Sequence, residues 1–561
     1  MKIFKAKILL FFVVSTIASA KDFDGDIISD AVYVESPTDT DLDGKLDQIY
    51  VTFSRPNTSE KVPTIYTITP YAYGGNQVPF HEVDVAYLPQ DNSADKWKLS
   101  NKMREFLRSK ELLDFAPNNV LQRGYASVQA HSLGTGRSTG CPTVGNMQES
   151  IAAKAVIDWL NGRAKAYSSS GREIKATWAN GAVGMYGVSY DGTLPNMVAA
   201  TGVDGLKAIV PIAAISSWYD YYRANGLVVG PGGYIGEDAD VLAKFIVRDG
   251  GGCNDQIGKI KESMGRENGD FTNFWLDRDY VQYAEQVKAA TFIVHGQSDW
   301  NVKQKHAIQW WQALDGKVPL RMWLHNGGHG DPDRRDFQDE MWDWFDRYVK
   351  GSENGVENKP RVEVQDAAGN WAEQNSWPNE HSSVVTYYIN GKNLEGSAPV
   401  SPVERVFKDS GKSTKIEDIA SNPSSENQAG LVFLSQKLDQ SKLLTGTPVV
   451  TLNLAVDNRH AANITVVLLE YDANNRAKVI TRGWSDLQNH ADMSTGEMLE
   501  KGKFYQMKFN LEPKQYKISS GSKIGVLVTA TDFDYTLRPD VGTILKLSGG
   551  GENKIELQLV D

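Results

Sequence analysis

The sequence contains only two cysteines, Cys141 and Cys253, among 561 residues. At most one intrachain disulfide can therefore form. An oxidising compartment would permit that bridge, and two separate buried thiols are the alternative. The sequence also lacks a P-loop, a dinucleotide-binding fingerprint and a cluster of zinc ligands. We accordingly expect no cofactor.

The sequence also has fewer basic than acidic residues and few long hydrophobic runs. The 59 Lys and Arg are outnumbered by 70 Asp and Glu, which gives a formal net charge of −11. This balance disfavours general binding to nucleic acid or to an anionic membrane. After the first twenty residues no apolar stretch is long enough to span a bilayer. Hydrophobic residues still make up 41% of the chain, enough for cores in two or three domains.

The N-terminus has the pattern of a signal peptide. Three lysines occur within the first seven residues, an apolar run follows over residues 8–14, and Ala18–Ala20 offers small residues for cleavage. We predict a signal peptide over residues 1–20, cleaved near Ala20, and export to the periplasm or the extracellular space. No cysteine follows the cleavage point, so a lipid anchor is not expected there.

Strand-like and helix-like segments alternate over most of the first 350 residues, which predicts a parallel sheet with helices on both faces. The expected strands are 64–69, 126–130, 182–186, 206–213, 291–295 and 320–324, and the expected helices are 149–160, 305–314 and 337–349. Residues 216–288 interrupt the alternation and predict a helical insertion over the sheet. A polar, turn-rich stretch at 351–359 indicates a boundary. We therefore expect an α/β catalytic domain over residues 21–355.

Beyond residue 360 the helical pattern almost disappears. Short runs with alternating side chains replace it, at 384–389, 448–454, 464–469, 505–511, 524–530 and 554–560. Their spacing predicts a C-terminal all-β domain over residues 356–561, either an antiparallel sandwich or a jelly roll.

The segment Gly187-Val-Ser189-Tyr-Asp-Gly192 follows an expected strand and precedes an expected helix. A serine on such a sharp turn is the nucleophile elbow of α/β-hydrolases, with its hydroxyl exposed above the sheet. The usual form is G-x-S-x-G, whereas here Asp191 takes the place of the second glycine, so a surface turn is the alternative. Pro195 should kink the following helix or delay its start.

A serine nucleophile needs a general base and an orienting acid, and in this fold the chain order is Ser, acid, His. Asp299 lies just past one expected strand and His329 lies in a glycine-rich loop just past the next. The carboxyl ends of the strands are where chemistry gathers in open α/β sheets. We therefore predict Ser189 as nucleophile, Asp299 as orienting acid and His329 as general base.

Other residues could compete for these roles. His295 and His325 lie within or at the end of strands, so a structural role is expected for both. Asp331 and Asp333 are too close to His329 in sequence to fit the usual topology. The backbone N–H of Tyr190 is expected in the oxyanion hole, and Tyr71, at the end of an early strand, could add its phenol or could simply pack in the core.

Asp39, Asp41 and Asp43 alternate before Gly44, as in the first half of a calcium loop. The bidentate Glu expected at the twelfth position is replaced by Tyr50. A solvated acidic turn is therefore preferred to a metal site, and calcium is kept as the weaker alternative.

Six segments together carry a family resemblance: Lys154–Arg163, Gly187–Thr193, Ile215–Leu227, Pro231–Asp238, Val294–Val302 and Leu324–His329. Through them the chain resembles the Xaa-Pro dipeptidyl-peptidase family of serine peptidases. That family lies within a wider group that includes cocaine-esterase-like and α-amino-acid ester hydrolases. The resemblance spans nearly the whole mature chain, and the elbow form G-x-S-Y-x-G is similar to that of the family.

The resemblance implies an α/β-hydrolase domain, a helical cap, a C-terminal jelly roll, the same triad and an oxyanion role for Tyr71. It further implies a pocket for a penultimate proline and a receptor for the substrate's N-terminal ammonium. The proline would contact Trp218, Tyr221, Trp300 and Val302, and the ammonium would meet Glu237, with Asp238 and Asn301 nearby. The substrate would be a peptide with a free N-terminus and a penultimate proline.

Two other functions remain open on the sequence. One is an esterase or amidase of the same fold that acts on α-amino-acid or small-molecule esters. The other is a glycan-binding surface protein that has lost its hydrolase activity, against which a complete triad argues. The long N-terminal helical domain of some family members is absent, so their mode of oligomerisation cannot be transferred to this chain.

Overall fold

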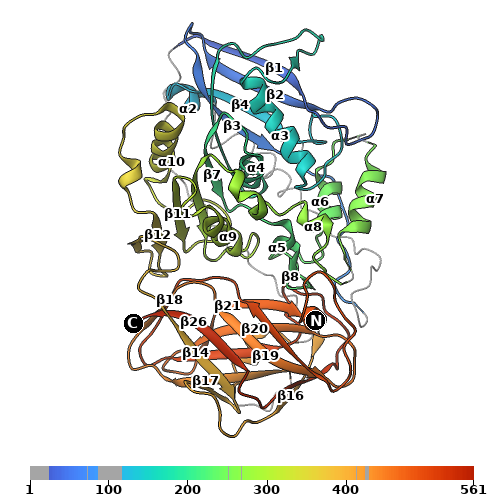
Figure 1. Ribbon diagram of the computed structural model, residues 1–561, viewed down its shortest axis with the longest axis vertical. Coiled ribbons are helices and arrows are strands. Elements are labelled where there is room, and N and C mark those ends of the chain that lie inside the picture. The colour runs from blue at the N-terminus through green and yellow to red at the C-terminus, as the bar shows by residue number, and fades with distance from the viewer. Residues whose placement is uncertain are drawn as a thin grey trace, which may run out of the picture.

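The computed structural model describes residues 25–72, 74–85, 117–249, 252–266, 268–411, 414–423 and 429–561. The expected signal peptide lies outside these ranges. The chain forms two stacked parts, one around a large sheet and one all-β unit below it (Figure 1). Within the described ranges no helix is both long and apolar enough to cross a bilayer.

The upper part is built on an eleven-stranded sheet. Its six central strands are parallel and lie in the order β11 (Leu320–His325), β10 (Ala290–Gly296), β7 (Leu206–Ile212), β6 (Ala179–Val188), β3 (Val62–Thr69) and β4 (Ala126–His131). Beyond β4 the sheet continues with antiparallel β2 (Gln48–Pro56) and β1 (Ile27–Glu35), and then the short β5 (Ala166–Tyr167).

Helices cover both faces of this sheet, which confirms the predicted α/β class. One face packs against α3 (Met147–Leu160), α4 (Tyr190–Ala199) and α9 (Lys305–Leu314), and the other against α2 (Pro117–Gln122) and α10 (Phe337–Phe345). Strand β7 shows why both faces need a cover: successive side chains of a strand point to opposite faces, and those of β7 are apolar on both. Ile209 joins the core under α4, while Ala208 and Val210 join the core under α10.

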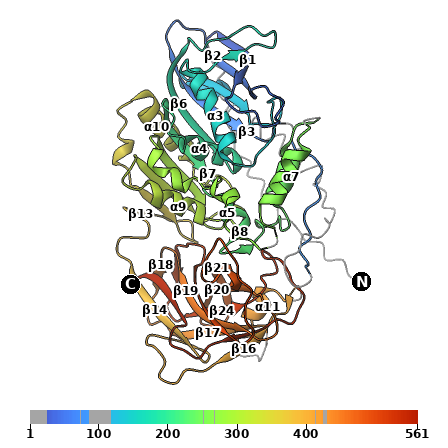
Figure 2. The same cartoon turned by 45° about the vertical axis from the view of Figure 1, so that its right-hand side comes forward.

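The insertion lies between β7 and β10 and packs beside the catalytic sheet (Figure 2). It contains α5 (Trp218–Tyr222), the hairpin of β8 (Arg223–Ala224) and β9 (Leu227–Val228), α6 (Ala239–Ile246), α7 (Asn254–Ser263), α8 (Asn273–Leu276) and the 3₁₀ helix η1 (Val281–Gln286). A disulfide joins Cys253, at the start of α7, to Cys141 in the segment after β4. The structure therefore favours the bridge over two separate thiols.

Two short strands that follow the expected domain boundary pair with the sheet of the upper part. Strand β12 (Val362–Gln365) pairs with β11, and β13 (Trp371–Gln374) pairs with β12, so both extend the catalytic sheet. The expected boundary at residue 355 therefore precedes two strands of the upper part. The polar stretch at 351–359 resembles a linker because it is the loop that leads from η2 (Asp346–Lys350), which continues α10, toward β12.

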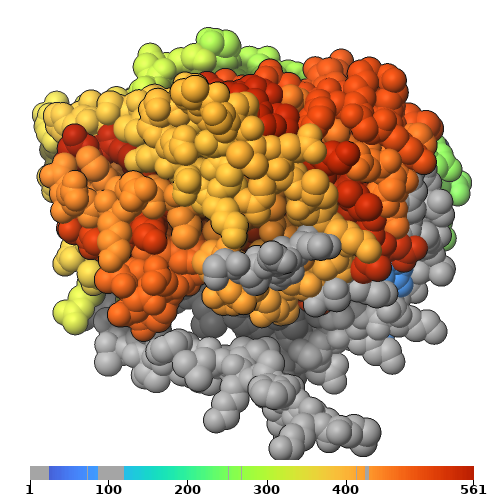
Figure 3. Space-filling model, turned by 90° about the horizontal axis from the view of Figure 1, so that it is seen from below, coloured from blue at the N-terminus to red at the C-terminus, as the bar shows by residue number. Residues whose placement is uncertain are grey.

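Over its described residues, the chain after residue 380 forms an all-β unit with short helical segments, α11 (Ile416–Ala420) and the 3₁₀ helix η5 (Leu487–Asn489), as the alternating runs predicted. Its strands are β14 (Ser383–Asn390), β15 (Asn393–Glu395), β16 (Arg405–Lys408), β17 (Gly430–Lys437), β18 (Lys442–Leu444), β19 (Val449–Val456), β20 (Asn463–Tyr471), β21 (Ala477–Asp486), β22 (Phe504–Asn510), β23 (Tyr516–Ile518), β24 (Lys523–Thr529), β25 (Ile544–Leu547) and β26 (Lys554–Val560). Seen from below, this unit dominates the molecular surface (Figure 3). It encloses a separate apolar core to which β19, β20 and β24 contribute.

Candidate active site

Ser189 sits on the turn between β6 and α4 in a strained backbone conformation. Its φ is 66° and its ψ is −128°, in a region that residues with a side chain rarely adopt. The Ser189 N–H donates to the carbonyl of Ile212 at the end of β7, at 2.9 Å, and the Ser189 carbonyl accepts from Thr193 N–H at 2.8 Å. These bonds hold the serine at the carboxyl edge of the sheet, where it remains partly exposed.

The two glycines of the elbow are required by close backbone contacts. A Cβ at Gly192 would lie 2.5 Å from the carbonyl oxygen of Gly187, and a Cβ at Gly187 would lie 2.3 Å from that of Asp191. Gly192 therefore serves as the second glycine of the motif, although it lies one position later than usual. Helix α4 begins at Tyr190 despite Pro195, so its start is not delayed, and the kink that was the other expected effect of Pro195 stays a prediction. Pro195 takes away the N–H that would otherwise bond to the Asp191 carbonyl, the group that packs on Gly187.

Asp299 and His329 meet directly. His329 Nδ1 lies 2.7 Å from Asp299 Oδ2. The other carboxylate oxygen, Oδ1, accepts the backbone N–H groups of Asn301 and Val302, each at 3.0 Å. Because a carboxylate can only accept, Nδ1 carries the proton and Nε2 is left free to act as a base. Asp299 is buried, whereas the His329 side chain is 25% exposed.

The loops that carry Asp299 and His329 are bonded to each other and to two further histidines. Ser298 N–H donates to the Gly327 carbonyl at 2.9 Å. His295 Nε2 lies 2.8 Å from the Val302 carbonyl, and His325 Nε2 lies 3.1 Å from that of Gly330. Burial lowers the pKa of His325 to about 4, so it stays neutral at physiological pH. These contacts match the structural role expected for both histidines.

Two tyrosines flank the nucleophile on the side of β3. Tyr71 follows β3, which pairs with β6, and its ring meets the Tyr190 ring edge-on at 6.2 Å. Burial raises the pKa of both phenols well above the usual value, so both keep their protons. Tyr71 can therefore donate a hydrogen bond, and the N–H of Tyr190 starts the helix next to Ser189.

A buried carboxyl group behind the elbow escaped the sequence analysis. Glu149 accepts hydrogen bonds from the hydroxyl of Tyr190 at 2.9 Å, the hydroxyl of Ser132 at 2.6 Å and the N–H of Gly145 at 2.7 Å. The sequence does carry a signal for it, since Glu149 shares the buried face of its helix with Ala152, Ala153 and Val156. A carboxyl group at a core position needs partners, and here one partner is the residue after the nucleophile.

A row of aromatic rings leads away from the nucleophile into the insertion. Tyr190 contacts Trp218 at 4.8 Å between ring centroids, Trp218 contacts Tyr221 at 5.7 Å, and Tyr221 contacts Tyr222 at 4.7 Å. We call Tyr71, Tyr190, Trp218, Tyr221 and Tyr222 the aromatic row. Trp218 and Tyr221 were predicted for the site, whereas Tyr222 was not.

Glu237 stands at the far end of the aromatic row. Its Oε1 accepts the Tyr222 hydroxyl at 2.8 Å. Burial, reinforced by the charge of neighbouring Asp238, raises the pKa of Glu237 to about 7, although the Tyr222 hydrogen bond opposes this shift. The group therefore stands near half-protonation at neutral pH, where a cationic partner would readily draw it into its charged form.

The other residues expected to bind substrate have protein partners. Asp238 is fully buried, with both oxygens engaged by Arg223 and Arg266 at 3.0–3.2 Å, and it also caps α6. Asn301 accepts the Tyr221 hydroxyl at 2.8 Å. Val302 is buried and Trp300 packs against the C-terminal domain. The Asp238 ion pairs could not be predicted from the sequence, because Arg266 lies 28 residues away along the chain.

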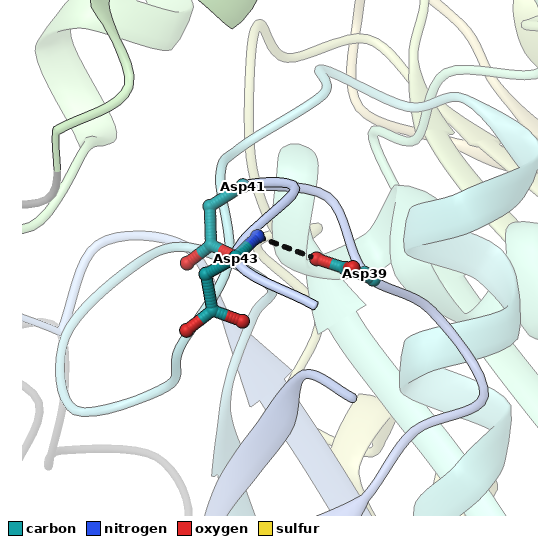
Figure 4. Close-up of side chains that lie close together, drawn as sticks. All are labelled: Asp39, Asp41 and Asp43. Carbon is teal, nitrogen blue, oxygen red and sulfur yellow. Dashed lines mark hydrogen bonds between the residues drawn. The ribbon is translucent and has the colours of Figure 1, made fainter. Parts of the chain in front are cut away.

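Asp39, Asp41 and Asp43 do gather in one turn, with one carboxylate oxygen from each within 4.8 Å of the others (Figure 4). Asp39 accepts the N–H groups of Asp43 and Gly44, each at 3.1 Å, and Lys45 pairs with Asp43 at 3.4 Å. These bonds explain the turn without a cation, and calcium remains the weaker expectation.

Ser189 lies on a strained strand-to-helix elbow after β6, and Asp299 and His329 follow β10 and β11. This arrangement, in the chain order Ser, Asp, His, defines a serine hydrolase of the α/β-hydrolase type. Two family models match the chain. "X-Pro dipeptidyl-peptidase (S15 family)" covers residues 43–331 and "X-Pro dipeptidyl-peptidase C-terminal non-catalytic domain" covers residues 354–557. The chain belongs to the X-Pro dipeptidyl-peptidase (S15) family.

Relatives cover nearly the whole chain. A Bacillus anthracis protein that carries the provisional name Xaa-Pro dipeptidyl-peptidase is 41% identical over 527 residues, 92% of this chain and 86% of its own length. The Xaa-Pro dipeptidyl-peptidase of Lactobacillus helveticus is 34% identical over 607 residues, 91% of this chain and 75% of its own.

Solved structures share the fold at low identity. A CocE/NonD family hydrolase from Staphylococcus aureus has a TM-score of 0.68 at 15% identity and covers 99% of this chain and 100% of its own. An α-amino acid ester hydrolase has a TM-score of 0.66 at 16% identity with the same coverage.

Proposed function

We propose that the protein removes Xaa-Pro dipeptides from the free N-terminus of peptides through an acyl-enzyme on Ser189. The observation that carries the proposal is the placement of Glu237. A single carboxyl group, held by Tyr222, stands at the end of an aromatic row that starts beside the nucleophile. Such a group can bind an α-ammonium and fix the distance from the substrate's N-terminus to the cleaved bond, about 7 Å for two extended residues.

Binding uses the middle of the aromatic row for the proline and its far end for the N-terminus of the substrate. The flat proline ring suits the aromatic faces of Trp218 and Tyr221. The N-terminal ammonium meets Glu237, which ionises as it binds. We assign the ammonium to Glu237 alone, because both oxygens of Asp238 already pair with arginine side chains. An N-acylated peptide would lose this contact.

Acyl transfer then needs the triad. Ser189 Oγ attacks the carbonyl carbon of the proline residue while His329 Nε2 takes the hydroxyl proton. The resulting oxyanion accepts the Tyr190 N–H and the Tyr71 hydroxyl. The C–N bond breaks as His329 returns the proton to the leaving amine, and the peptide departs with a new N-terminus. Water, deprotonated by His329, hydrolyses the ester, and the dipeptide leaves as Ser189 regains its proton.

Hydrolysis of three chromogenic substrates by the purified mature protein tests the proposal. We expect turnover of Ala-Pro-p-nitroanilide and little or none of N-acetyl-Ala-Pro-p-nitroanilide. Turnover of p-nitrophenyl acetate without turnover of either peptide would keep the triad and move the activity to the esterase class. Equal turnover of both peptides would remove the ammonium role of Glu237.

We also propose that the enzyme is exported and that its signal peptide is removed near Ala20. The disulfide between Cys141 and Cys253 supports an oxidising destination. Mass spectrometry of the protein from its native cells, after fractionation, should give an N-terminus close to Lys21 outside the cytoplasm. An uncleaved chain in the cytoplasmic fraction would contradict this proposal.

A further inference from the structure

The loop that carries Asp299 is bonded within its own domain and is also contacted by residues of the C-terminal domain. We call residues 297–304, between β10 and α9, the acid loop. In both ribbon views the upper edge of the C-terminal domain, with β21 and β20, lies directly under the catalytic domain (Figures 1 and 2). Residues of the C-terminal domain contact the acid loop at its beginning and middle and reach α9 where the loop ends.

The first contact is at Gln297, which immediately follows β10 and is buried. The Lys514 ammonium donates to the Gln297 carbonyl, and the Gln515 N–H donates to the side-chain oxygen of Gln297 at 3.0 Å. Burial lowers the pKa of Lys514 to about 8. Burial of this ammonium is costly, and its hydrogen bond to the Gln297 carbonyl offsets part of that cost.

The second contact is at Trp300, the neighbour of Asp299. Its ring packs against Tyr535 at 5.5 Å and Trp484 at 6.3 Å between centroids. The Arg482 guanidinium lies 5.4 Å from the Trp300 ring and is held by Asp532 at 2.9 Å. Contacts of this kind fix the plane of a ring as well as burying it.

The third contact is at the beginning of α9. The backbone N–H of Lys305 donates to the Glu512 carboxylate at 3.2 Å. Glu512 is a buried residue of the C-terminal domain. It lies among the charges of Lys303, Lys305 and Asp220. The acid loop is therefore bounded at both ends by polar contacts to the C-terminal domain and packed in the middle by its aromatic residues.

The same contacts extend to the segment that carries Glu237. Gly232 N–H donates to the Trp300 carbonyl and Gly230 N–H donates to the Tyr535 carbonyl, each at 2.7 Å. Residues 230–237 are thus tied both to the acid loop and to the C-terminal domain. A shift of Tyr535 would move Asp299 and Glu237 together.

We propose that the C-terminal domain is a positioning element of the active site, in which Lys514, Trp484 and Tyr535 hold the acid loop where His329 needs it. The matching family model calls this domain non-catalytic. None of these side chains needs to touch the substrate. They act through Asp299 on the rate of the chemical step and through residues 230–237 on the binding of a free N-terminus.

The test compares truncations of tyrosines within the C-terminal domain. Tyr535→Ala removes the ring beneath Trp300, and Tyr535→Phe restores it. Tyr387→Ala is the matched control, because Tyr387 is partly buried on β14 and packs on the domain's own core. Each variant is checked by calorimetry for a folded population, and kcat and KM are measured on p-nitrophenyl acetate and on Ala-Pro-p-nitroanilide.

Tyr535→Ala should lower kcat on both substrates by roughly 10–100-fold, the scale of a catalytic group displaced by about 1 Å. It should raise KM only for the peptide, because only the peptide uses Glu237. Tyr535→Phe should recover wild-type constants and Tyr387→Ala should keep them. A folded Tyr535→Ala with wild-type kcat, or an equal loss in Tyr387→Ala, overturns the proposal.

Lys514→Met covers the case in which Tyr535→Ala does not fold. It keeps the length of the side chain and removes the hydrogen bond to Gln297, and a kcat loss on the ester without a change in ester KM is expected. Unchanged kcat in this variant would contradict the positioning role. The kcat and KM measured on the peptide substrate are informative only if the proposed function is correct, whereas those measured on the ester do not depend on it. A wild-type protein that cleaves only the ester would contradict the peptidase proposal. The kcat of the variants on the ester would still test the positioning role of the C-terminal domain.

Discussion

The nucleophile elbow and the acid loop reach the same active site but are held by different means. The elbow is fixed by backbone contacts within a few residues, between Gly187, Asp191 and Gly192, and by the end of β7. The acid loop has hydrogen bonds within its domain, such as Ser298 to Gly327, and is in addition contacted by side chains from a different domain, such as Lys514 and Tyr535. Local steric contacts can place a nucleophile, whereas a loop without regular structure requires support from neighbouring parts of the molecule.

The largest effect is expected at the nucleophile. Ser189→Gly should reduce kcat at least about 10⁴-fold, since the remaining triad has no hydroxyl to activate. The same change should raise thermal stability relative to Ser189→Ala, because a φ of 66° strains alanine but not glycine. Calorimetry of both variants beside a kinetic assay checks this, and a lower Tm for the glycine variant would refute stored strain in the elbow.

The next effect concerns the close approach at Gly192. In Gly192→Ala the new methyl group would lie 2.5 Å from the Gly187 oxygen and 2.8 Å from the Ile212 oxygen. We expect a loss of about 100-fold in kcat and about 1–3 kcal/mol of stability. Gly258→Ala is the matched control, because Gly258 lies in helix α7 with open space around its Cα. Wild-type kinetics in Gly192→Ala would show that the elbow tolerates displacement.

A smaller effect is expected when the elbow loses the support of helix α3. Glu149→Ala leaves the hydroxyls of Tyr190 and Ser132 without their buried acceptor, at a cost of about 2 kcal/mol. If the same free energy is lost from the stabilisation of the transition state, kcat declines about 30-fold while the KM for the ester stays constant. Glu262→Ala, an exposed change on α7, should alter neither quantity. A stable Glu149→Ala with full kcat would mean that the backbone alone holds the elbow.

The smallest expected effect is on KM and concerns Glu237, in the segment 230–237 that is hydrogen-bonded to the acid loop. Burial raises the pKa of Glu237 to about 7, so the carboxyl group becomes neutral as the pH falls below 7 and can no longer pair with the substrate's ammonium. The KM for Ala-Pro-p-nitroanilide should rise about tenfold between pH 8 and pH 6. Glu237→Gln should abolish this dependence, and the ester assay corrects for titration of the triad. A pH-independent KM in the wild type would contradict the assignment.

The sequence was most informative where chemistry and local geometry coincide. Three residues, Ser189, Asp299 and His329, could be chosen because each follows a strand, and the ends of parallel strands meet at one edge of a sheet. The α/β alternation likewise predicted α9 at Lys305–Leu314 with its observed bounds. Periodicity and strand order are local or nearly local signals, which explains this success.

The sequence was uninformative where side chains meet across long separations. Asp238 looked like a ligand for substrate, yet it pairs with Arg223 and Arg266. Trp300 looked like part of a proline pocket, and its ring packs against Tyr535 and Trp484. The partners of Asp238 depend on how the insertion folds, and those of Trp300 on how the two domains dock. Neither arrangement is encoded in a local sequence pattern.

The separation between the acid loop and its supports also sets an order of events during synthesis. Gln297 and Gln515 are 218 residues apart in the chain. A ribosome adds about 5–20 residues per second, so the nucleophile, the acid and the histidine are all made some 10–40 seconds before the supports of the acid loop exist. If the C-terminal domain positions the acid loop as proposed, the nascent chain carries all its catalytic residues before that support exists, and full activity is reached only after the last domain has folded.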